Sequence, residues 1–122
     1  MGRRVLVIED EPSIAEAIGF ILARDGWEVQ SHDRGAGALE LIRAQRPDLV
    51  ILDLMLPGRT GLDILRALRA EVETAALPVL MLTARNQSRD RELAESCGAS
   101  RFMVKPFCNT EVLASVRELV AS

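Results

Sequence analysis

The stretch from Asp48 to Gly61 constrains the fold of this chain more than any other part of the sequence. Leu49–Leu52 is a short, wholly apolar run, which is typical of a strand covered on both faces of a parallel sheet. The run ends on the carboxylate of Asp53, and Pro57–Gly58 then interrupts the chain before a new helical pattern begins. Because ligands bind beyond the carboxyl ends of such strands, Asp53 is a candidate functional residue. Capping of a turn is the alternative role for this aspartate.

Apolar runs elsewhere predict four more strands, and apolar residues at helical spacing predict five helices. The expected strands are Val5–Ile8, Trp27–Ser31 at a sheet edge, Val79–Thr83 and Arg101–Val104. The first expected helix has Ser13 as its cap and ends before Gly26, and the next two cover Ala36–Ala44 and Leu62–Ala70. The fourth ends at Gly98 and is expected to bury Leu93, Ala94 and Cys97. The last covers Thr110–Val120. This alternation predicts a single α/β domain, residues 1–122, with a flavodoxin-like, doubly wound (βα)5 fold and parallel strands ordered 2-1-3-4-5.

The overall composition argues against several classes of function. The net charge of −3 gives no basic footprint for nucleic acid or for an anionic membrane surface. No apolar run reaches the ~20 residues of a membrane span. Cys97 and Cys108 lack the spacing of a metal or redox motif, so reduced thiols in the cytoplasm are expected. We therefore expect a domain that contacts neither nucleic acid nor membrane directly.

Charged and polar residues stand at the ends of the predicted strands. Glu9 and Asp10 follow the first strand, Asp53 and Thr83 end the third and fourth, and Lys105 follows the fifth. Each has an ordinary explanation when taken alone. The acids after the first strand can be an acidic helix start, Thr83 a β-branched strand residue, and Lys105 a surface charge. Together they predict one site, since carboxylates crowded at one edge require a cation between them. Hard oxygen ligands favour Mg²⁺, and Lys105 is the only lysine among fifteen lysines and arginines.

Four ordered motifs carry a resemblance to a known family. They are Val7-Ile8-Glu9-Asp10-Glu11-Pro12, Leu52-Asp53-Leu54-Met55-Leu56-Pro57-Gly58 with Gly61, Leu82-Thr83-Ala84-Arg85, and Val104-Lys105-Pro106-Phe107. With these motifs the whole chain resembles the receiver (CheY-like) domain of two-component response regulators, most of all the OmpR/PhoB type. The resemblance implies a phosphorelay protein that assists its own phosphorylation, and not a conventional turnover enzyme.

The resemblance also implies the role of each site residue. Asp53 would accept a phosphoryl group from a phosphohistidine of a sensor histidine kinase or phosphotransfer protein. Mg²⁺ would be bound by Asp10, Asp53 and the Met55 carbonyl, with Glu9 contributing directly or through water. Thr83 and Lys105 would contact the phosphate oxygens. This chemistry agrees with the residues themselves, because phosphoryl transfer depends mainly on positioning and charge neutralisation.

A switch to an output surface is implied as well. In the family, the residue at Thr83 moves toward the phosphate and the aromatic residue at Phe102 turns inward, which changes the face made by the fourth helix, fifth strand and last helix. Phe102 stands where family members often carry tyrosine, so a hydrogen-bonded readout is not available from this ring. The resemblance further suggests a cis Lys105–Pro106 peptide, which an X-Pro bond tolerates.

Departures on that face argue against the family's usual dimer. Arg91 and Glu111 match one of its ion pairs. The departures are Glu92 and Glu95 at the outward patch positions of the fourth helix, and Arg101 and Ser115 in place of the usual Asp and Arg. Because carboxylates in an apolar patch oppose association, we expect a monomer or a dimer through another surface. Whether an output domain follows residue 122 is left open by the sequence.

The residues two after Asp53 and two after Thr83 bear on the lifetime of an acyl phosphate. Met55 offers no strong group to orient a water molecule, and Arg85 is long enough to reach a phosphate oxygen. This combination predicts slow self-dephosphorylation, unless both side chains point to solvent.

Two other classes of function remain as alternatives. A haloacid-dehalogenase-like phosphatase also uses a strand-end aspartate, but it needs a second acid where this chain has Met55. A flavodoxin-like ligand-binding module would need a Gly-rich first turn, and Glu9–Pro12 has the wrong chemistry for it.

Overall fold

The computed structural model describes residues 3–84 and 88–121 of the chain, in which five strands alternate with five helices. In chain order the elements are β1 (Arg4–Ile8), α1 (Pro12–Arg24), β2 (Glu28–His32), α2 (Ala38–Gln45), β3 (Leu49–Asp53), α3 (Gly61–Ala70), β4 (Val79–Thr83), α4 (Ser88–Ser96), β5 (Arg101–Val104) and α5 (Asn109–Ala121). No helix in this described part has both the length and the apolar character needed to cross a membrane.

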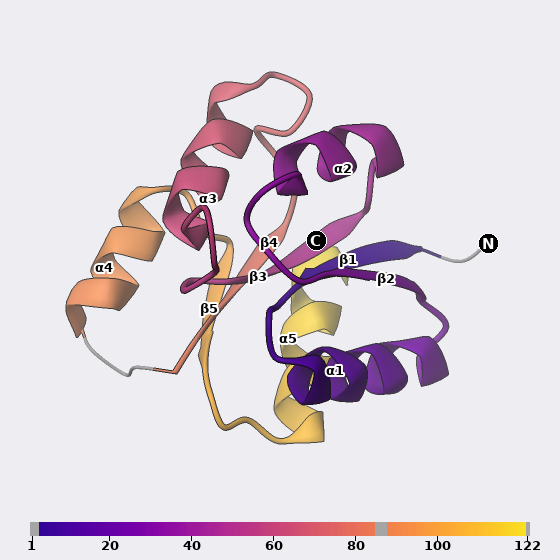
Figure 1. Cartoon of the computed structure of the whole chain (residues 1–122). Coiled ribbons are helices and arrows are strands. Elements are labelled where there is room, and N and C mark those ends of the chain that lie inside the picture. Colours follow the sequence, from indigo (N-terminus) through magenta and orange to yellow (C-terminus); the bar gives the residue numbers. More distant parts are fainter. Residues whose placement is uncertain (1–2, 85–87, 122) are drawn as a thin grey trace.

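The strands form one sheet in the order β2-β1-β3-β4-β5, and all four pairings are parallel. The predicted doubly wound, flavodoxin-like architecture is therefore confirmed. Helices α1 and α5 cover one face of the sheet, and α2, α3 and α4 cover the other (Figure 1). Because every strand runs the same way, all five carboxyl ends meet at one edge of the sheet.

Two apolar clusters, one on each face, hold the sheet in place. Every residue of β3 and of β4 is buried, which explains why both strands read as continuous apolar runs. One cluster joins the sheet to α1 and α5, and the other joins it to α2, α3 and α4. The strand that ends on Asp53 is thus enclosed on both faces, and removing a buried side chain such as Leu52 would cost about 2–5 kcal/mol.

The predicted elements are confirmed with shifted boundaries. The edge position of β2 is confirmed, and its residues are exposed or half-buried. Helix α2 begins at Ala38 and not at Ala36, because the Gly35 N–H donates to the Pro57 carbonyl at 3.0 Å and Gly37 adopts a φ of 79°. The loop before α2 is therefore held against the β3–α3 loop, and the helix starts later.

Two local predictions are wrong. Ser13 does not cap α1, since the helix already begins at Pro12 and its N-cap residue is Glu11. Proline is favoured at the first helical position because it lacks the N–H that would otherwise be unsatisfied. Leu93 was expected in the core but is 38% exposed, whereas Ala94 is buried as predicted and Cys97 is half-buried. Helix α4 lies at the end of its layer (Figure 1). Ala94 is its one buried residue among those whose side chains the structure describes.

Candidate functional site

The predicted site residues are brought together at the carboxyl ends of the central strands. Glu9 directly follows β1, Asp53 and Thr83 end β3 and β4, and Lys105 directly follows β5. Backbone hydrogen bonds extend the sheet past these ends, from Leu54 N–H to the Leu82 carbonyl at 2.8 Å and from Lys105 N–H to the Thr83 carbonyl at 2.7 Å. The strand ends are therefore fixed relative to one another before any ligand binds.

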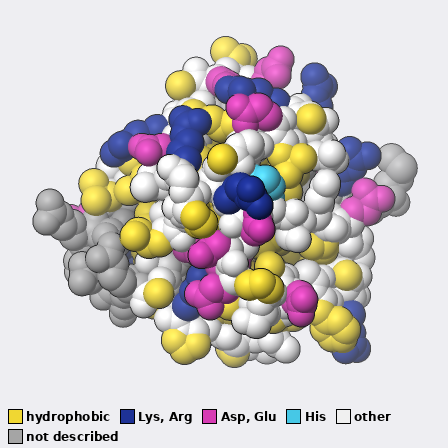
Figure 2. All heavy atoms as spheres, viewed as in Figure 1, with side chains coloured by type: hydrophobic (Ala, Val, Ile, Leu, Met, Phe, Trp, Pro, Cys, Tyr) yellow, Lys and Arg dark blue, Asp and Glu magenta, His cyan; other side chains and the backbone are white. Residues whose placement is uncertain are grey.

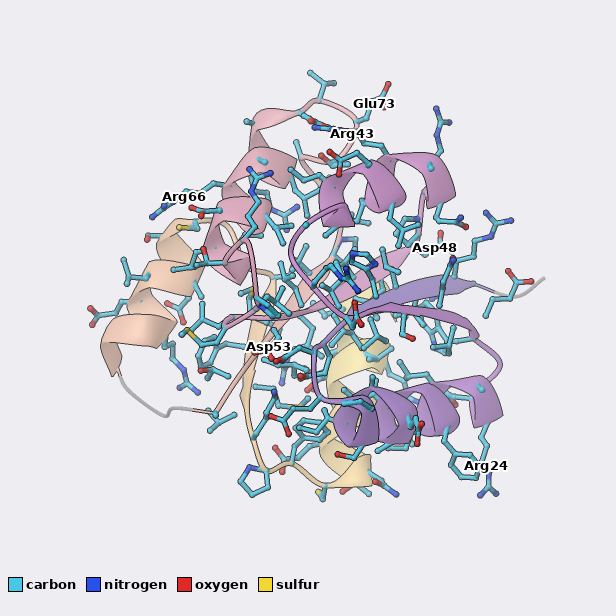
Figure 3. The ribbon with its side chains drawn as sticks, viewed as in Figure 1. Arg24, Arg43, Asp48, Asp53, Arg66 and Glu73 are labelled. Carbon is cyan, nitrogen blue, oxygen red and sulfur yellow. The ribbon has the colours of Figure 1, made fainter. Side chains whose placement is uncertain are left out.

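Asp53 is held by a different donor on each carboxylate oxygen. Its Oδ1 accepts a hydrogen bond from the Met55 N–H at 3.2 Å, and its Oδ2 accepts one from Lys105 Nζ at 3.1 Å. The residue is only 4% exposed, and its side chain lies at the end of β3 (Figure 3). A buried carboxylate with this orientation can act as a nucleophile toward a group placed just outside the sheet edge.

Glu9 and Lys105 form a buried ion pair beside Asp53. Lys105 Nζ lies 2.6 Å from Glu9 Oε1, and the two side chains are 10% and 0% exposed. Glu9 Oε2 accepts a hydrogen bond from the Glu11 N–H at 3.0 Å. Oε1 has no partner in hydrogen-bond geometry and is the one such buried side-chain atom in the described residues. The ion pair with Lys105 is therefore the contact of Oε1, and its geometry is poor for a hydrogen bond.

Burial acts on the pKa values of Glu9 and Lys105 in opposite directions. Burial raises the pKa of Glu9 to about 7, and the Lys105 ammonium and the Glu11 N–H offset only part of that effect. Burial alone would lower the pKa of Lys105, but its contacts with Glu9 and Asp53 raise that pKa above its ordinary value. The ammonium thus stays charged, while the Glu9 carboxylate lacks enough positive charge around it.

Three carboxylates form a cluster with room for a cation. Glu9, Asp10 and Asp53 each offer one oxygen, and these oxygens lie within 4.8 Å of one another. Glu9 and Asp53 are buried and Asp10 is exposed, so the cluster opens to solvent on one side. Acidic side chains also gather near the middle of the face in Figure 2. An all-oxygen cluster that is open to water on one side fits the requirements of Mg²⁺.

Gly61 belongs to one of the four family motifs, but no role in the site was predicted for it from the sequence. A Cβ at this position would lie 2.2 Å from the Asp53 carbonyl oxygen, so only glycine allows α3 to approach the end of β3. The Gly61 N–H donates to the Leu54 carbonyl at 3.0 Å, and Thr60 caps the helix by accepting from the Asp63 N–H at 3.2 Å. The spacing of Gly61 from Asp53 was the signal that could have identified it.

Two further predicted residues, Thr83 and Met55, are described near this cluster. Thr83 is fully buried and pairs in register with Val104 next to Lys105. Met55 is 58% exposed, whereas Arg85 lies outside the described residues. The Lys105–Pro106 peptide is cis, as predicted.

Two arginines on the face formed by α4, β5 and α5 contact side chains of the same face. The Arg91 guanidinium lies 5.4 Å from the centroid of the Phe102 ring. Arg101 forms an ion pair with Glu118. Glu92 and Glu95 are exposed, as the sequence predicted.

Comparison with known sequences agrees with this geometry. The family model of the response regulator receiver domain matches residues 5–117. The DNA-binding response regulator MtrA of Mycolicibacterium smegmatis is 42% identical over 117 residues, which cover 96% of this chain and 50% of MtrA. The chain spans about half the length of the curated relatives it matches.

Solved structures are similar over the whole fold. The chemotaxis protein CheY4 of Vibrio cholerae has a TM-score of 0.92 and 28% identity, covering 98% of this chain and 100% of that one. The receiver domain of the sensor histidine kinase PA1611 from Pseudomonas aeruginosa, with a magnesium ion coordinated in its active-site cleft, has a TM-score of 0.91 and 28% identity, covering 100% of both chains. The resemblance predicted from the motifs is confirmed, and this chain belongs to the response regulator receiver domain family.

Proposed function

We propose that Asp53 is the phosphoacceptor of this receiver domain in a two-component phosphorelay. The observation that carries the proposal is the hydrogen bond of 3.1 Å from Lys105 Nζ to a buried Asp53 oxygen, next to two further carboxylates. The ammonium places positive charge beside the carboxylate oxygen, where the phosphoryl oxygens would need it during transfer. The donor would be a phosphohistidine on a sensor histidine kinase or on a phosphotransfer protein.

In this reaction an Asp53 oxygen attacks phosphorus, the phosphorus–nitrogen bond of the phosphohistidine breaks, and the imidazole leaves with the bonding electrons. Lys105 neutralises charge on the phosphoryl oxygens, and the Met55 N–H keeps the Asp53 carboxylate oriented. Such residues accelerate the transfer through positioning and electrostatic stabilisation, because phosphoryl transfer needs little other chemistry. Thr83 would contact a phosphoryl oxygen once the group is in place.

Asp10, Asp53 and the Met55 carbonyl would hold Mg²⁺, with Glu9 contributing directly or through water. When bound, the ion supplies positive charge that offsets the phosphoryl oxygens and the crowded carboxylates. The similar PA1611 receiver domain holds magnesium in its active-site cleft, which supports the assignment. The oxygens of Glu9, Asp10 and Asp53, which lie within 4.8 Å of one another in this chain, support it independently.

We further propose that Thr83 and Phe102 transmit the phosphorylated state to the α4–β5–α5 face, where an output domain or partner protein would bind. Exposed Glu92 and Glu95 on that face favour a monomer. Since MtrA is a DNA-binding response regulator and this chain matches half of it, DNA contact would belong to a segment other than this domain.

We propose a cytoplasmic location, in keeping with two free cysteines.

The protein would not be a conventional turnover enzyme. A haloacid-dehalogenase-like phosphatase would need an acid at the position of Met55, which is an exposed apolar residue here. Because the methionine side chain cannot orient a water molecule, the acyl phosphate is proposed to hydrolyse slowly.

Intact-mass spectrometry with a small phosphodonor such as acetyl phosphate tests the proposal. We expect a single phosphoryl addition in the presence of Mg²⁺ and little addition when the metal is chelated. Multiple additions, or a single addition that is independent of Mg²⁺, would contradict the proposed site.

A further inference from the structure

The Phe102 ring lies between the core and one charged side chain. On one side it packs against the apolar cluster that joins the sheet to α2, α3 and α4. On the other side the Arg91 guanidinium lies 5.4 Å from the ring centroid, which is within the range of a cation–π interaction. Phe102 is half-buried as a result, and Arg91 covers part of its outward side.

The neighbouring charges do not compete for Arg91. Glu111 accepts a hydrogen bond from the Cys108 N–H at 3.4 Å at the start of α5. The other arginine of this face, Arg101, pairs with Glu118. No ion pair joins Arg91 to any side chain that the structure describes, so the aromatic ring is its main contact there.

The identity of the aromatic residue makes this contact more important for the position of the ring. Phenylalanine has no hydroxyl, so Phe102 cannot be held by a hydrogen bond in either of two positions. The ring can be held from outside only through its face, and arginine is the cation that stacks best on such a face. The ring and the guanidinium also line a cavity of 360 Å³ together with Glu111 and Ser115.

We propose that Arg91 stabilises the resting position of Phe102 and thereby opposes the switch to the phosphorylated conformation. This inference rests on the proposed function, in which Phe102 turns inward when Asp53 carries a phosphoryl group. An interaction present in only one of two conformations shifts the equilibrium toward that conformation. Loss of the Arg91 contact should therefore let a phosphoryl group, or an analogue of it, drive the switch more easily.

Fluorine NMR of protein labelled with 4-fluorophenylalanine follows the ring directly, since the chain has three phenylalanines. A Phe102→Leu variant assigns the resonance. Beryllofluoride is titrated in the presence of Mg²⁺ into wild type, Arg91→Gln, Arg91→Lys and Arg101→Gln. Arg101→Gln is the matched control, because it removes the same charge from the same face without an aromatic contact.

We expect Arg91→Gln to reach half-conversion at a beryllofluoride concentration about 2–5-fold lower than wild type. Arg91→Lys should stay close to wild type, and so should Arg101→Gln. An equal midpoint for Arg91→Gln and wild type overturns the inference, as does an equal change in both glutamine variants.

The spectra without beryllofluoride test the contact separately from the switch. Arg91→Gln should move the Phe102 resonance and leave that of Phe20 in place. Arg24→Gln should do the reverse, since the Arg24 guanidinium lies 5.6 Å from the Phe20 ring centroid. An unmoved Phe102 resonance in Arg91→Gln overturns the inference. A wild-type protein that does not respond to beryllofluoride contradicts the proposed function itself, and with it any switching role for Arg91.

Discussion

Lys105 Nζ and Asp53 Oδ2 are 3.1 Å apart although the two residues are 52 positions apart in sequence. The parallel sheet brings them together, because β3 and β5 flank β4 and end at the same edge. The same ammonium lies 2.6 Å from Glu9 Oε1, so one cation serves two buried carboxylates. The site thus carries an excess of negative charge that a divalent cation would offset.

Replacing Lys105 tests how much this one cation stabilises the metal-free domain. Lys105→Gln leaves two buried carboxylates without their cation, and breaking a buried ion pair costs about 3–5 kcal/mol. We expect the free energy of unfolding in urea, measured with the metal chelated, to fall by that order, and Mg²⁺ to restore part of it. Arg117→Gln is the control, because the Arg117 side chain is 64% exposed and its ion pair with Asp25 should contribute less than about 1 kcal/mol. Equal losses in the two variants would show that Lys105 has no special role.

The pKa of Glu9 predicts an unusual dependence of stability on pH. It is raised from 4.5 to about 7, so between these values the folded domain binds more protons than the unfolded chain. Stability from this group is fully present below the unfolded pKa and is lost as pH rises through the folded pKa. The metal-free domain should therefore lose about 1–3 kcal/mol of its free energy of unfolding as pH rises across this window.

Glu9→Gln should remove most of that pH dependence, because glutamine does not ionise. Glu16→Gln, at an exposed position of α1, should leave it unchanged. Urea unfolding at several pH values with chelator measures both. A Glu9→Gln variant that keeps the wild-type slope would mean that another group titrates.

Gly61→Ala should disturb the site from the backbone side. The new Cβ would lie 2.2 Å from the Asp53 carbonyl oxygen, and overpacking of this kind costs about 1–3 kcal/mol. We expect a lower melting temperature together with slower phosphorylation by acetyl phosphate, since the strand end that carries Asp53 must move. Gly19→Ala in α1 meets only Val29 Cγ1 at 3.4 Å and should be neutral or stabilising. If both alanine variants phosphorylate at the wild-type rate, the close approach at Gly61 does not position Asp53.

Met55→Asn should shorten the lifetime of the phosphorylated state. An amide at this exposed position can orient a water molecule, which methionine cannot do, so we expect decay at least ~3-fold faster. The loss of phosphate is followed by intact mass after removal of the phosphodonor. Arg85→Ala and the double variant complete the series, and Val72→Asn at a 95% exposed position is the control. Identical decay in all of them would mean that neither position controls access of water.

Much of the fold and the core of the site could be predicted from sequence, because both depend on strand ends. A buried parallel strand is recognisable as an apolar run, and the residue after it must lie at the sheet edge. Glu9, Asp53, Thr83 and Lys105 were located in this way, and the structure brings all four together. The burial that sets the pKa of Glu9 is a property of the packed edge and has no signature in the chain.

The errors have local physical causes. Ser13 and Pro12 both favour the start of a helix, and the fixed φ of proline decided the boundary. Leu93 has the spacing of a core residue, but α4 has no layer beyond it to cover a second apolar stripe, and the side chain remains 38% exposed. The stacking of Arg91 on Phe102 joins two segments through side-chain conformation, which no sequence pattern indicates.

The central claim is that Asp53 is the single phosphoacceptor, and intact mass of wild type and Asp53→Asn with acetyl phosphate and Mg²⁺ tests it most directly. The amide cannot act as the nucleophile, and the fold should survive because Lys105 keeps Glu9 as a partner at 2.6 Å. We predict one phosphoryl group on the wild type and none on the variant, whose melting curve should remain cooperative. A folded Asp53→Asn protein that gains a phosphoryl group at the wild-type rate would contradict the account.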